Sequence, residues 1–439
     1  MSAVVIGLGF VGLTLALALA DKGVMVFGVE SNNGSYRTIS AGKPTINEKG
    51  IELFLRRNLG RTFMVFEKLE DVPGSEVDTY VICVGTPLQS GSPYIGYLKS
   101  ATESVGKHMK GNEMVIVRST VPIGTTRKIV LPILRGELKK RGIETQVNIA
   151  FAPERTAEGV ALQELYELPQ IVGGINEESV SRSMNLFRRL TPTVIMVSSV
   201  ETAEMIKLID NSYRDVRFAY ANEIALMCEK LGIDANECIS KSNVHYPRNS
   251  IPFPSPGVGG PCLSKDPYIL AQEELVDYLP NKRSLIIAGR RLNEAIPELL
   301  AEKIKSKIRS KNKSAKDLKV FVMGFAFKGH PETNDTRDSP TIPLVNILKK
   351  DFNIYGHDPA VPKDIIEAAG ATPTDIESGF KNAACVIIMN NHMSYRNLDV
   401  TSLVEKAARP FIFVDCWRLY DKKIFETMDG VTYTGVGIV

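Results

Sequence analysis

The feature that most constrains the fold lies at the N-terminus, in the stretch SAVVIGLGFVGLTLALALADKGVMVFGVE. A short apolar run leads into Gly7, Gly9 and Gly12, and a helix-length apolar segment follows them. Glycines at this spacing permit a tight turn, close approach of a pyrophosphate, and close packing of helix on strand, with the helix N-terminus facing the phosphates. The stretch therefore predicts a strand, a phosphate-binding turn and a helix of the dinucleotide-binding type.

The second apolar run of this stretch ends at Glu30. A carboxylate at that place accepts hydrogen bonds from ribose hydroxyls and repels a 2′-phosphate, which predicts NAD rather than NADP. The alternative is a glycine-rich turn with no ligand, but strand, helix, second strand and acid stand in the order that a dinucleotide site requires. The residues predicted to contact NAD here are Gly7, Gly9, Phe10, Val11, Gly12 and Glu30.

Short apolar runs alternate with helix-length segments in the first and last thirds of the chain. They occur at residues 79–84, 114–118 and 147–151, and again in LKVFVMGFAF, FNIYGHD, ACVIIMN and FIFVD. Such alternation is typical of parallel, doubly wound sheets. Between them, residues 202–231 contain neither Gly nor Pro and predict one long helix that begins an all-helical middle segment.

We therefore expect an α/β chain in which two Rossmann-like parallel-sheet domains are joined by a long central helix. The predicted boundaries are 1–198 for the NAD-binding domain, 199–309 for the helical segment and 310–439 for the last domain. The long helix is apolar on more than one side, which favours a homodimer formed through it.

Composition excludes several classes of protein. No apolar run of the 439 residues reaches the roughly 18 residues of a membrane span, and the N-terminus lacks the basic region of a signal peptide. The basic run at 303–319 is interpreted as a solvated helix end and linker, so no nucleic-acid partner is expected. Six scattered cysteines without CxxC spacing indicate a reducing cytoplasm, and neither they nor the histidines predict a metal site.

A second site is indicated by GVGGPCLSKDPY, residues 257–268. A lone cysteine is usually an inert small hydrophobe, but Cys262 stands in a glycine loop and is followed by Lys265 and Asp266. Together with a nicotinamide cofactor, a cysteine nucleophile suggests a two-step oxidation. An alcohol loses a hydride to give an aldehyde, the thiolate adds to it, a second hydride leaves to give a thioester, and water releases an acid.

Other polar groups that this chemistry needs follow predicted strands or lie on the long helix. They occur in STVPIGTT at 119–126, in APERTAEG at 152–159, and at Lys207, Asn211 and Arg214, which share a helix face. Lys207 alone would more often be a solvated helix lysine, but its pairing with Asn211 on an unusually apolar helix favours the stabilisation of an oxyanion. Glu158 and Asp266 are two candidates for the base that activates water.

Taken together, these stretches resemble the nucleotide-sugar 6-dehydrogenases of the UDP-glucose/GDP-mannose dehydrogenase family. The resemblance covers nearly the whole chain. It is carried by GLGFVG at residue 7, VGTPL at 84, STVPIGTT at 119, PERTAEG at 153, KLIDNSYRDVRFAYANE at 207, GVGGPCLSKDP at 257 and GFAFKGHPETNDTRDSP at 324. It implies an NAD-binding domain, a helical dimerisation segment and a C-terminal UDP-binding domain, in an enzyme that supplies uronic acids to polysaccharide biosynthesis.

The resemblance also implies roles for single residues. Cys262 would be the nucleophile, supported by Lys207, Asn211 and Asp266, and Thr120 and Glu158 would serve the water step. The other residues implied at the cofactor are Thr86, Thr120, Glu154 and Arg337. Those implied at the substrate are Glu154, Arg155, Lys207, Asn211, Arg214, Arg248, Gly259 and Lys328, with Arg248 reaching the site of a neighbouring subunit.

The sugar is indicated by the residue after PE. In UDP-glucose enzymes this residue is typically phenylalanine, whereas here it is Arg155, as in the N-acetylhexosamine enzymes. A guanidinium can donate to an acetamido carbonyl, whereas a structural ion pair of Arg155 with Glu154 or Glu158 is the alternative. We expect a UDP-N-acetylhexosamine substrate, with UDP-N-acetylmannosamine first and UDP-N-acetylglucosamine as an alternative. CLSKD at the cysteine favours UDP-glucose instead. A two-electron hydroxyacid dehydrogenase and an NAD-binding protein without activity are remoter alternatives.

Overall fold

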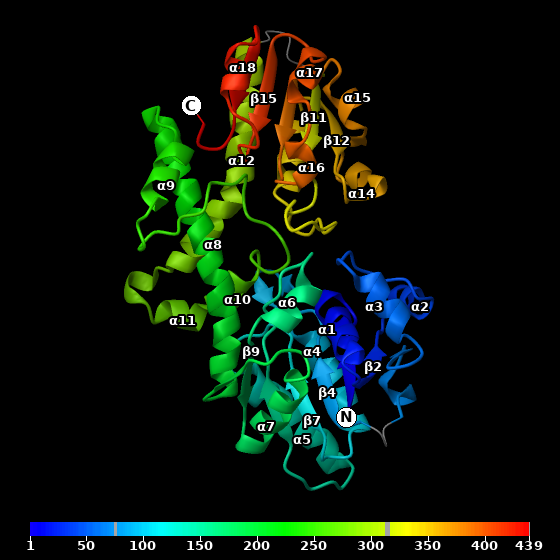
Figure 1. Cartoon of the computed structure of the whole chain (residues 1–439). Helices are drawn as coiled ribbons and strands as arrows, with labels where there is room; N and C mark the ends of the chain where they lie inside the picture. Colours follow the sequence, from blue (N-terminus) through cyan, green and yellow to red (C-terminus); the bar gives the residue numbers. More distant parts are fainter. Residues whose placement is uncertain (74–76, 312–316, 439) are drawn as a thin grey trace. The chain divides into compact units, whose positions relative to one another are not determined.

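The computed structural model describes residues 1–73, 77–311 and 317–438. The chain divides into an N-terminal unit, Met1–Asp210 with Tyr268–Gln272, and a C-terminal unit, Asn211–Pro267 with Glu273–Val439. Each unit contains one sheet of mostly parallel strands with helices packed on it (Figure 1). The predicted α/β class with two Rossmann-like sheets is therefore confirmed.

The sheet of the N-terminal unit has the strand order β10-β9-β8-β7-β4-β1-β2-β3. Its strands are β1 (Ser2–Ile6), β2 (Met25–Val29), β3 (Phe63–Phe66), β4 (Thr79–Ile82), β7 (Met114–Val117), β8 (Asn148–Phe151), β9 (Gln170–Gly174) and β10 (Val194–Val197). A small hairpin, β5 (Leu88–Gln89) and β6 (Ser92–Pro93), lies outside it. The prediction of a purely parallel sheet is wrong at one place, because β8 and β9 pair antiparallel. The chain therefore re-enters the sheet at the edge where β8 ends, without a crossover.

Helices cover both faces of this sheet, so most of its strands are apolar at every position. One core joins the strands to α1 (Phe10–Asp21), α3 (Ile51–Asn58), α6 (Ala161–Glu167) and α7 (Glu177–Phe187). The core on the other face joins them to α4 (Gly96–His108), α5 (Leu131–Lys140) and the first turn of the next long helix. The short α2 (Asn33–Ser40) follows β2.

The predicted long helix is α8 (Val200–Leu231), which is 32 residues long. Four further helices complete the middle of the chain, namely α9 (Ala235–Asn243), α10 (Asp266–Leu270), α11 (Glu273–Asp277) and α12 (Leu285–Lys311). A loop at 244–265 without helix or strand separates α9 from α10 and carries the predicted nucleophile. Much of the basic run at 303–319 belongs to α12, whereas its residues 312–316 lie outside the described residues.

The sheet of the C-terminal unit has six strands in the order β13-β12-β11-β14-β15-β16, and all neighbouring pairs are parallel. The strands are β11 (Lys319–Met323), β12 (Asn353–His357), β13 (Thr372–Pro373), β14 (Cys385–Ile388), β15 (Phe411–Asp415) and β16 (Val431–Thr434). In order of appearance this is 3-2-1-4-5-6, which is also the order of β3-β2-β1-β4-β7-β8 in the N-terminal sheet. The two sheets therefore repeat one architecture.

Helices also cover both faces of the C-terminal sheet. One core contains α12, the end of α8, α9, α13 (Thr341–Leu348) and α14 (Lys363–Ala368). The other core is aromatic and contains α15 (Ile376–Phe380), α16 (Met393–Arg396), α17 (Val400–Glu405) and α18 (Lys423–Glu426). The end of α8 thus packs within the C-terminal unit, and its first turns pack within the N-terminal unit.

Candidate functional site

The glycine turn after β1 has the geometry that the sequence predicts. Gly7 has a φ of +86°, which glycine adopts without strain, and a Cβ on Gly12 would lie 1.8 Å from the carbonyl oxygen of Gly7. By contrast, no protein atom lies within 4 Å of the place of a Cβ on Gly9. The first turn of α1 contains no acidic residue, so its N–H groups face the turn without a competing carboxylate. The turn therefore fits a pyrophosphate at Gly9 and at the N-terminus of α1.

Glu30 lies where β2 ends and connects the glycine turn to the segment after the strand. Its Oε2 accepts a hydrogen bond from the N–H of Leu8 at 2.9 Å, and its Oε1 accepts one from the N–H of Asn32 at 2.8 Å. Each oxygen keeps a further lone pair for a ribose hydroxyl. A cavity of about 440 Å³ is lined by Gly7, Gly9, Glu30 and the ring of Tyr97. These residues of the N-terminal unit fit the adenosine half of NAD.

The predicted residues Thr86 and Thr120 lie in loops that follow adjacent strands, β4 and β7. The hydroxyl of Thr86 donates to the carbonyl of Thr120 at 2.6 Å, and that of Ser119 donates to the carbonyl of Val84 at 2.7 Å. The two loops are therefore joined at the carboxyl edge of the sheet, where ligands bind in such folds.

Glu204, which was not identified from the sequence, fixes the loop after β7 at Gly124 and Thr126. Its carboxylate accepts hydrogen bonds from the N–H groups of Gly124 and Thr126, at 2.5 and 2.8 Å. The residue is fully buried on α8, and burial raises the pKa of its carboxyl against these hydrogen bonds. Its position on a helix about 80 residues away gave no signal, because helix periodicity does not indicate which loop a buried carboxylate reaches.

Glu154 was predicted at the cofactor and the substrate, and it lies buried just after β8. Arg118 donates to its Oε2 through Nη2 at 2.6 Å and through Nε at 3.0 Å, and the N–H groups of Arg155 and Thr156 donate to its Oε1 at 2.7 Å. Burial opposes ionisation of this carboxyl, but Arg118, the Thr156 hydrogen bond and the charge of Lys207 outweigh it and lower its pKa. Glu154 is thus held as an anion within the N-terminal unit.

Arg118 is a second residue that sequence reasoning missed, although its position directly after the apolar strand MVIV was a usable signal. The guanidinium is fully buried and stacks on the ring of Phe187 at 5.1 Å. A charge in that position requires a partner, because an unpaired buried ion is costly. Here the partner is the carboxylate of Glu154.

Arg155 extends from the same loop and is exposed. Its Nε donates to Asp210 of α8 at 2.9 Å, so it forms an ion pair, but with neither of the acids that the sequence suggested. Glu158 is partly buried in this loop, and Lys207 is buried on α8. Asp210 therefore fixes the direction of the Arg155 side chain in the N-terminal unit.

The loop that carries Cys262 belongs to the C-terminal unit and depends on its glycines. A Cβ on Gly259 would lie 2.1 Å from the carbonyl oxygen of Asp338, and Gly260 has a φ of +89°. The N–H of Gly260 donates to the carbonyl of Arg337 at 3.2 Å. The loop can approach the segment 324–340 this closely only because both positions lack a side chain. Cys262 itself is exposed.

Three polar residues surround the helix start that follows Cys262. The N–H of Asp266, the first residue of α10, donates to the carbonyl of Cys262 at 2.9 Å. The side chain of Asp266 is fully buried, with Lys265 Nζ 2.8 Å from Oδ1 and Asn211 Nδ2 2.5 Å from Oδ2. The structure thus brings Asn211, Lys265 and Asp266 together at the base of the cysteine loop.

The remaining predicted substrate residues, and the predicted cofactor residue Arg337, lie at separate places in the C-terminal unit. Lys328 follows Phe327, whose ring lies 2.7 Å from the place of a Cβ on Gly260, and Arg337 pairs with Asp335 through Nη2 at 2.5 Å. The loop with Lys328 and Arg337 is therefore adjacent to the cysteine loop. Arg214 lies on α8, and Arg248 stacks on the ring of Tyr246 at 5.4 Å.

Two further classes of site are absent from the described residues. At 1–73, 77–311 and 317–438, no three His, Cys, Asp or Glu residues gather in a way that could hold a metal ion. In the same residues, no helix has the length and apolarity needed to cross a bilayer.

Three family models of the UDP-glucose/GDP-mannose dehydrogenase family match the chain. The NAD binding domain matches residues 1–191, the central domain 201–295, and the UDP binding domain 321–422. The fit of NAD to the glycine turn and to Glu30 agrees with the first of them.

Individual proteins give the same result. A UDP-N-acetyl-D-mannosamine dehydrogenase of Pyrococcus horikoshii is 32% identical over 100% of this chain and 99% of its own length. A solved structure of the UDP-N-acetylmannosamine enzyme from this organism has a TM-score of 0.86, with 100% of this chain and 99% of that chain covered at 30% identity. A UDP-glucose dehydrogenase from Pyrobaculum islandicum matches with a TM-score of 0.85 at 25% identity, covering 100% of this chain and 98% of that chain. The chain therefore belongs to the UDP-glucose/GDP-mannose dehydrogenase family and is an NAD-dependent nucleotide-sugar dehydrogenase.

Proposed function

We propose that this enzyme oxidises the C6 alcohol of UDP-N-acetylmannosamine to the uronic acid in two steps, through a thioester on Cys262. The exposed Cys262, one turn before a buried Asp266 that holds Asn211, is the observation that carries the two-step chemistry. The choice of UDP-N-acetylmannosamine is supported by the similar protein and the similar structure from P. horikoshii. It is also supported by Arg155, whose direction Asp210 fixes. NAD, when bound, accepts a hydride in each step, and the proton of the C6 hydroxyl is released in the first.

The residues of the chain divide the remaining work. The Cys262 thiolate forms a sulfur–carbon bond to C6 of the aldehyde, and the carbonyl oxygen becomes an oxyanion. Lys207 and Asn211, one turn apart on α8, supply a cation and a hydrogen-bond donor for that oxyanion. After hydride loss from C6, water attacks the thioester and the thiolate leaves, which restores Cys262.

We assign activation of that water to Glu158 rather than to Asp266. Both oxygens of the Asp266 carboxylate are engaged, by Lys265 and by Asn211, and the side chain is fully buried. Such a carboxylate orients the amide of Asn211 more readily than it removes a proton from water. Glu158, partly buried in the loop after β8, then serves as the base, and Thr120, in the loop after β7, supplies a hydroxyl.

The test is NADH formation by the purified enzyme with UDP-N-acetylmannosamine, UDP-N-acetylglucosamine and UDP-glucose, each supplied separately. We expect two NADH per UDP-N-acetylmannosamine and little from the other sugars. Cys262→Ala should form no acid product. A preference for UDP-glucose would mean that Arg155 is structural. That second candidate is supported by CLSKD at Cys262 and by the equally close fold of the P. islandicum enzyme.

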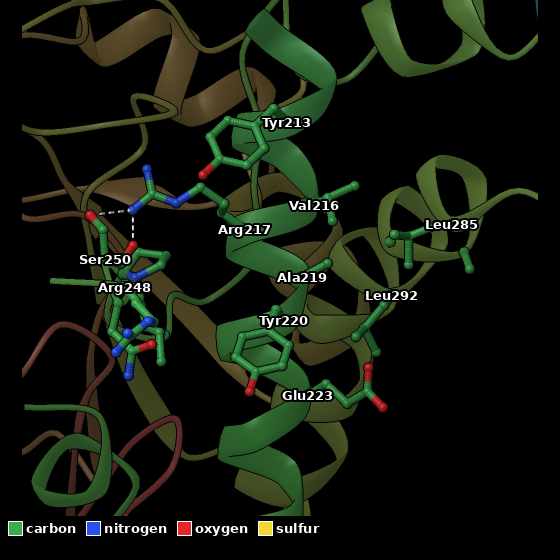
Figure 2. Close-up of a pocket in the computed structure, with 15 residues that line it drawn as sticks. Tyr213, Val216, Arg217, Ala219, Tyr220, Glu223, Arg248, Ser250, Leu285 and Leu292 are labelled. Carbon is green, nitrogen blue, oxygen red and sulfur yellow. Dashed lines mark hydrogen bonds between the residues drawn. The ribbon is translucent and has the colours of Figure 1, made fainter. Parts of the chain in front are cut away.

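We further propose that two copies of this chain associate along α8. A cavity of about 690 Å³ lies beside this helix, between the loop at 248–252 and the start of α12 (Figure 2). Tyr213 and Tyr220 of α8 and Leu285 of α12 border it with 61%, 52% and 72% of their surfaces exposed. Exposed aromatic and aliphatic side chains that gather in this way favour a protein partner. Light scattering should give twice the chain mass of 48.3 kDa, and a monomer would contradict the proposal.

The predicted boundaries at 1–198, 199–309 and 310–439 remain part of the proposal. They are supported by the three segments that the family models match, 1–191, 201–295 and 321–422. In this division α8 begins the helical segment, and β11 begins the last domain.

A further inference from the structure

A buried ion pair lies in the C-terminal unit, outside the residues assigned to the reaction. Arg290 of α12 and Asp215 of α8 are 1% and 0% exposed, and Arg290 Nη1 lies 2.7 Å from Asp215 Oδ1. Such a pair is a weak source of stability, because removing both charges from water costs about as much as their attraction returns. The contacts of this pair indicate another role.

The guanidinium of Arg290 reaches the backbone on both sides of Cys262. Its Nη2 donates to the carbonyl of Val258 at 2.8 Å, and its Nη1 donates to the carbonyl of Leu263 at 3.0 Å. Val258 lies four residues before Cys262, and Leu263 is the residue directly after it. One planar cation thus joins two points of the loop to each other and to Asp215.

Asparagines of the same two helices extend this network to a third point of the loop. Asn293 Nδ2 donates to Asp215 Oδ1 at 2.9 Å, and Asn222 Nδ2 donates to Asn293 Oδ1 at 3.0 Å. Asn222 Oδ1 in turn accepts from the N–H of Ser255 at 2.8 Å. All of these side chains are buried, so water does not compete for their hydrogen bonds.

Packing against the segment 324–340 restricts the loop at Gly259 and Gly260, but it leaves space beside Val258 and Ser264. A cavity of about 390 Å³ borders Val258 and Ser264 on the side of Arg290, Pro297 and Pro340. Next to a cavity, a loop loses the dispersion contacts that would otherwise restrict it. The hydrogen bonds of Arg290 to Val258 and Leu263 therefore add a restraint on this side of the loop to those of Gly260 with Arg337 and of Ser264 with Asp338.

We propose that Arg290, oriented by Asp215, is a positioning residue that fixes Cys262 for capture of the aldehyde. It does not take part in the hydride transfers. Its loss leaves the first oxidation in place and lets the aldehyde escape before the sulfur–carbon bond forms. Lysine cannot replace it, because an ammonium on a flexible stem lacks the rigid fork of donors with which Arg290 reaches Asp215, Val258 and Leu263 at once. The inference rests on the proposed role of Cys262 as nucleophile.

The test compares Arg290→Met and Arg290→Lys with Arg291→Met, which removes an exposed charge at the next position of α12. UDP-N-acetylmannosamine, or whichever sugar the wild type turns over best, is oxidised with and without hydroxylamine, which traps a released aldehyde as its oxime. We expect wild type and Arg291→Met to form two NADH per sugar and no oxime. Both Arg290 variants should release oxime and form close to one NADH per sugar, with kcat down about tenfold or more and KM changed less than about threefold.

A structural role alone would lower the yield of folded enzyme or its melting temperature but leave the ratio at two NADH per sugar without oxime. That result in the folded Arg290→Lys enzyme would overturn the inference, even where Arg290→Met does not fold. Cys262→Ala separates the two proposals. Suppose that Cys262→Ala forms one NADH per sugar with oxime, while the Arg290 variants form two NADH per sugar. That result rejects only the role of Arg290. If Cys262→Ala forms two NADH per sugar, Cys262 is not the nucleophile, and the inference about Arg290 is rejected with it.

Discussion

The two sheets share one strand order and begin in the same way, but the turn after the first strand differs. The N–H of Gly7 donates to the carbonyl of Val29, and that of Gly324 donates to the carbonyl of His357, each at 2.9 Å. Both glycines have a positive φ. In the N-terminal sheet α1 then starts at Phe10, whereas in the C-terminal sheet α13 starts only at Thr341.

Only one glycine of the N-terminal turn is matched in the C-terminal sheet. A Cβ on Gly7 would meet Cys83, which follows β4, and a Cβ on Gly324 would meet Asn390, which follows β14. The first glycine is thus required by the neighbouring strand in both sheets. Gly9 has no such neighbour, and the C-terminal sheet replaces this part of the turn by the segment 324–340. The sheet therefore does not require the tight turn at Gly9, which agrees with the prediction that this turn serves a dinucleotide.

The acid that follows the second strand, Glu30 in the N-terminal sheet and Asp358 in the C-terminal sheet, also differs in its hydrogen bonds. Asp358 accepts hydrogen bonds from the N–H groups of Phe325 and Ala326 at 2.7 and 3.0 Å, and from those of Ala360 and Val361 at 2.9 and 3.1 Å. Glu30 accepts only two such hydrogen bonds, from Leu8 and Asn32, and borders a cavity. The acid at this position thus faces a cavity in one sheet and binds the backbone in the other.

The largest expected effect comes from Gly12→Ala. The new Cβ would collide with the carbonyl of Gly7 and push α1 away from β1. We expect a loss of about 1–3 kcal/mol of stability from this overpacking and a fall in NAD affinity of about a hundredfold or more. Thermal unfolding and titration with NAD measure the two effects.

Gly9→Ala is the matched control for that variant. Its Cβ meets no protein atom, so the unfolding temperature should not fall while the NAD dissociation constant rises about tenfold. Unchanged NAD affinity in Gly9→Ala would show that the pyrophosphate does not lie against this residue.

The second prediction exchanges the two acids for their amides. Asp358→Asn loses acceptors for buried N–H groups and should cost about 1–3 kcal/mol of stability, with NAD affinity unchanged. Glu30→Gln should weaken NAD binding about tenfold and reduce the preference for NAD over NADP, at a smaller cost in stability. Urea unfolding and cofactor titration distinguish the two. The comparison fails if both variants lose stability equally and NAD affinity stays unchanged.

A smaller effect is expected from pH. The pKa values of two buried acids at the carboxyl edges of the two sheets are shifted in opposite directions. Arg118 helps to lower the pKa of Glu154 below its usual 4.5, so Glu154 stabilises the fold above pH 4.5, and this contribution is lost as the pH falls through the folded-state pKa. Burial raises the pKa of Asp415 above its usual 3.8, so its ionised form costs stability at neutral pH. That cost disappears as the pH falls from the raised value toward 3.8.

Urea midpoints between pH 7 and pH 3 for the wild type, Glu154→Gln and Asp415→Asn measure this difference. Glu154→Gln should flatten the acid side of the curve, and Asp415→Asn should remove a gain that the wild type shows on mild acidification. Parallel curves for all three proteins would contradict the assignment of opposite shifts.

Local signals allowed much of this molecule to be predicted. The glycine turn, Glu30 and the cysteine loop lie in short stretches whose residues contact one another, and α8 is continuous in sequence. Partners that are distant in sequence were not predictable in this way. Arg118 with Glu154, Glu204 with the loop at 124–126, and Arg290 with Asp215 each join segments that only the folded chain brings together. The antiparallel β9 was missed because an apolar strand carries no mark of its direction.

Cys262 is the exposed cysteine among the six, all of which lie in described residues. Cys238 is partly buried and the other four are buried, and burial raises the pKa of the thiols of Cys83, Cys228, Cys385 and Cys416. A maleimide or iodoacetamide reagent should therefore modify the native protein first at one position. The enzyme would then carry its own attachment point for a fluorophore in the loop at 244–265, and the mass added per chain would count the chains with a free thiol there, without any mutation.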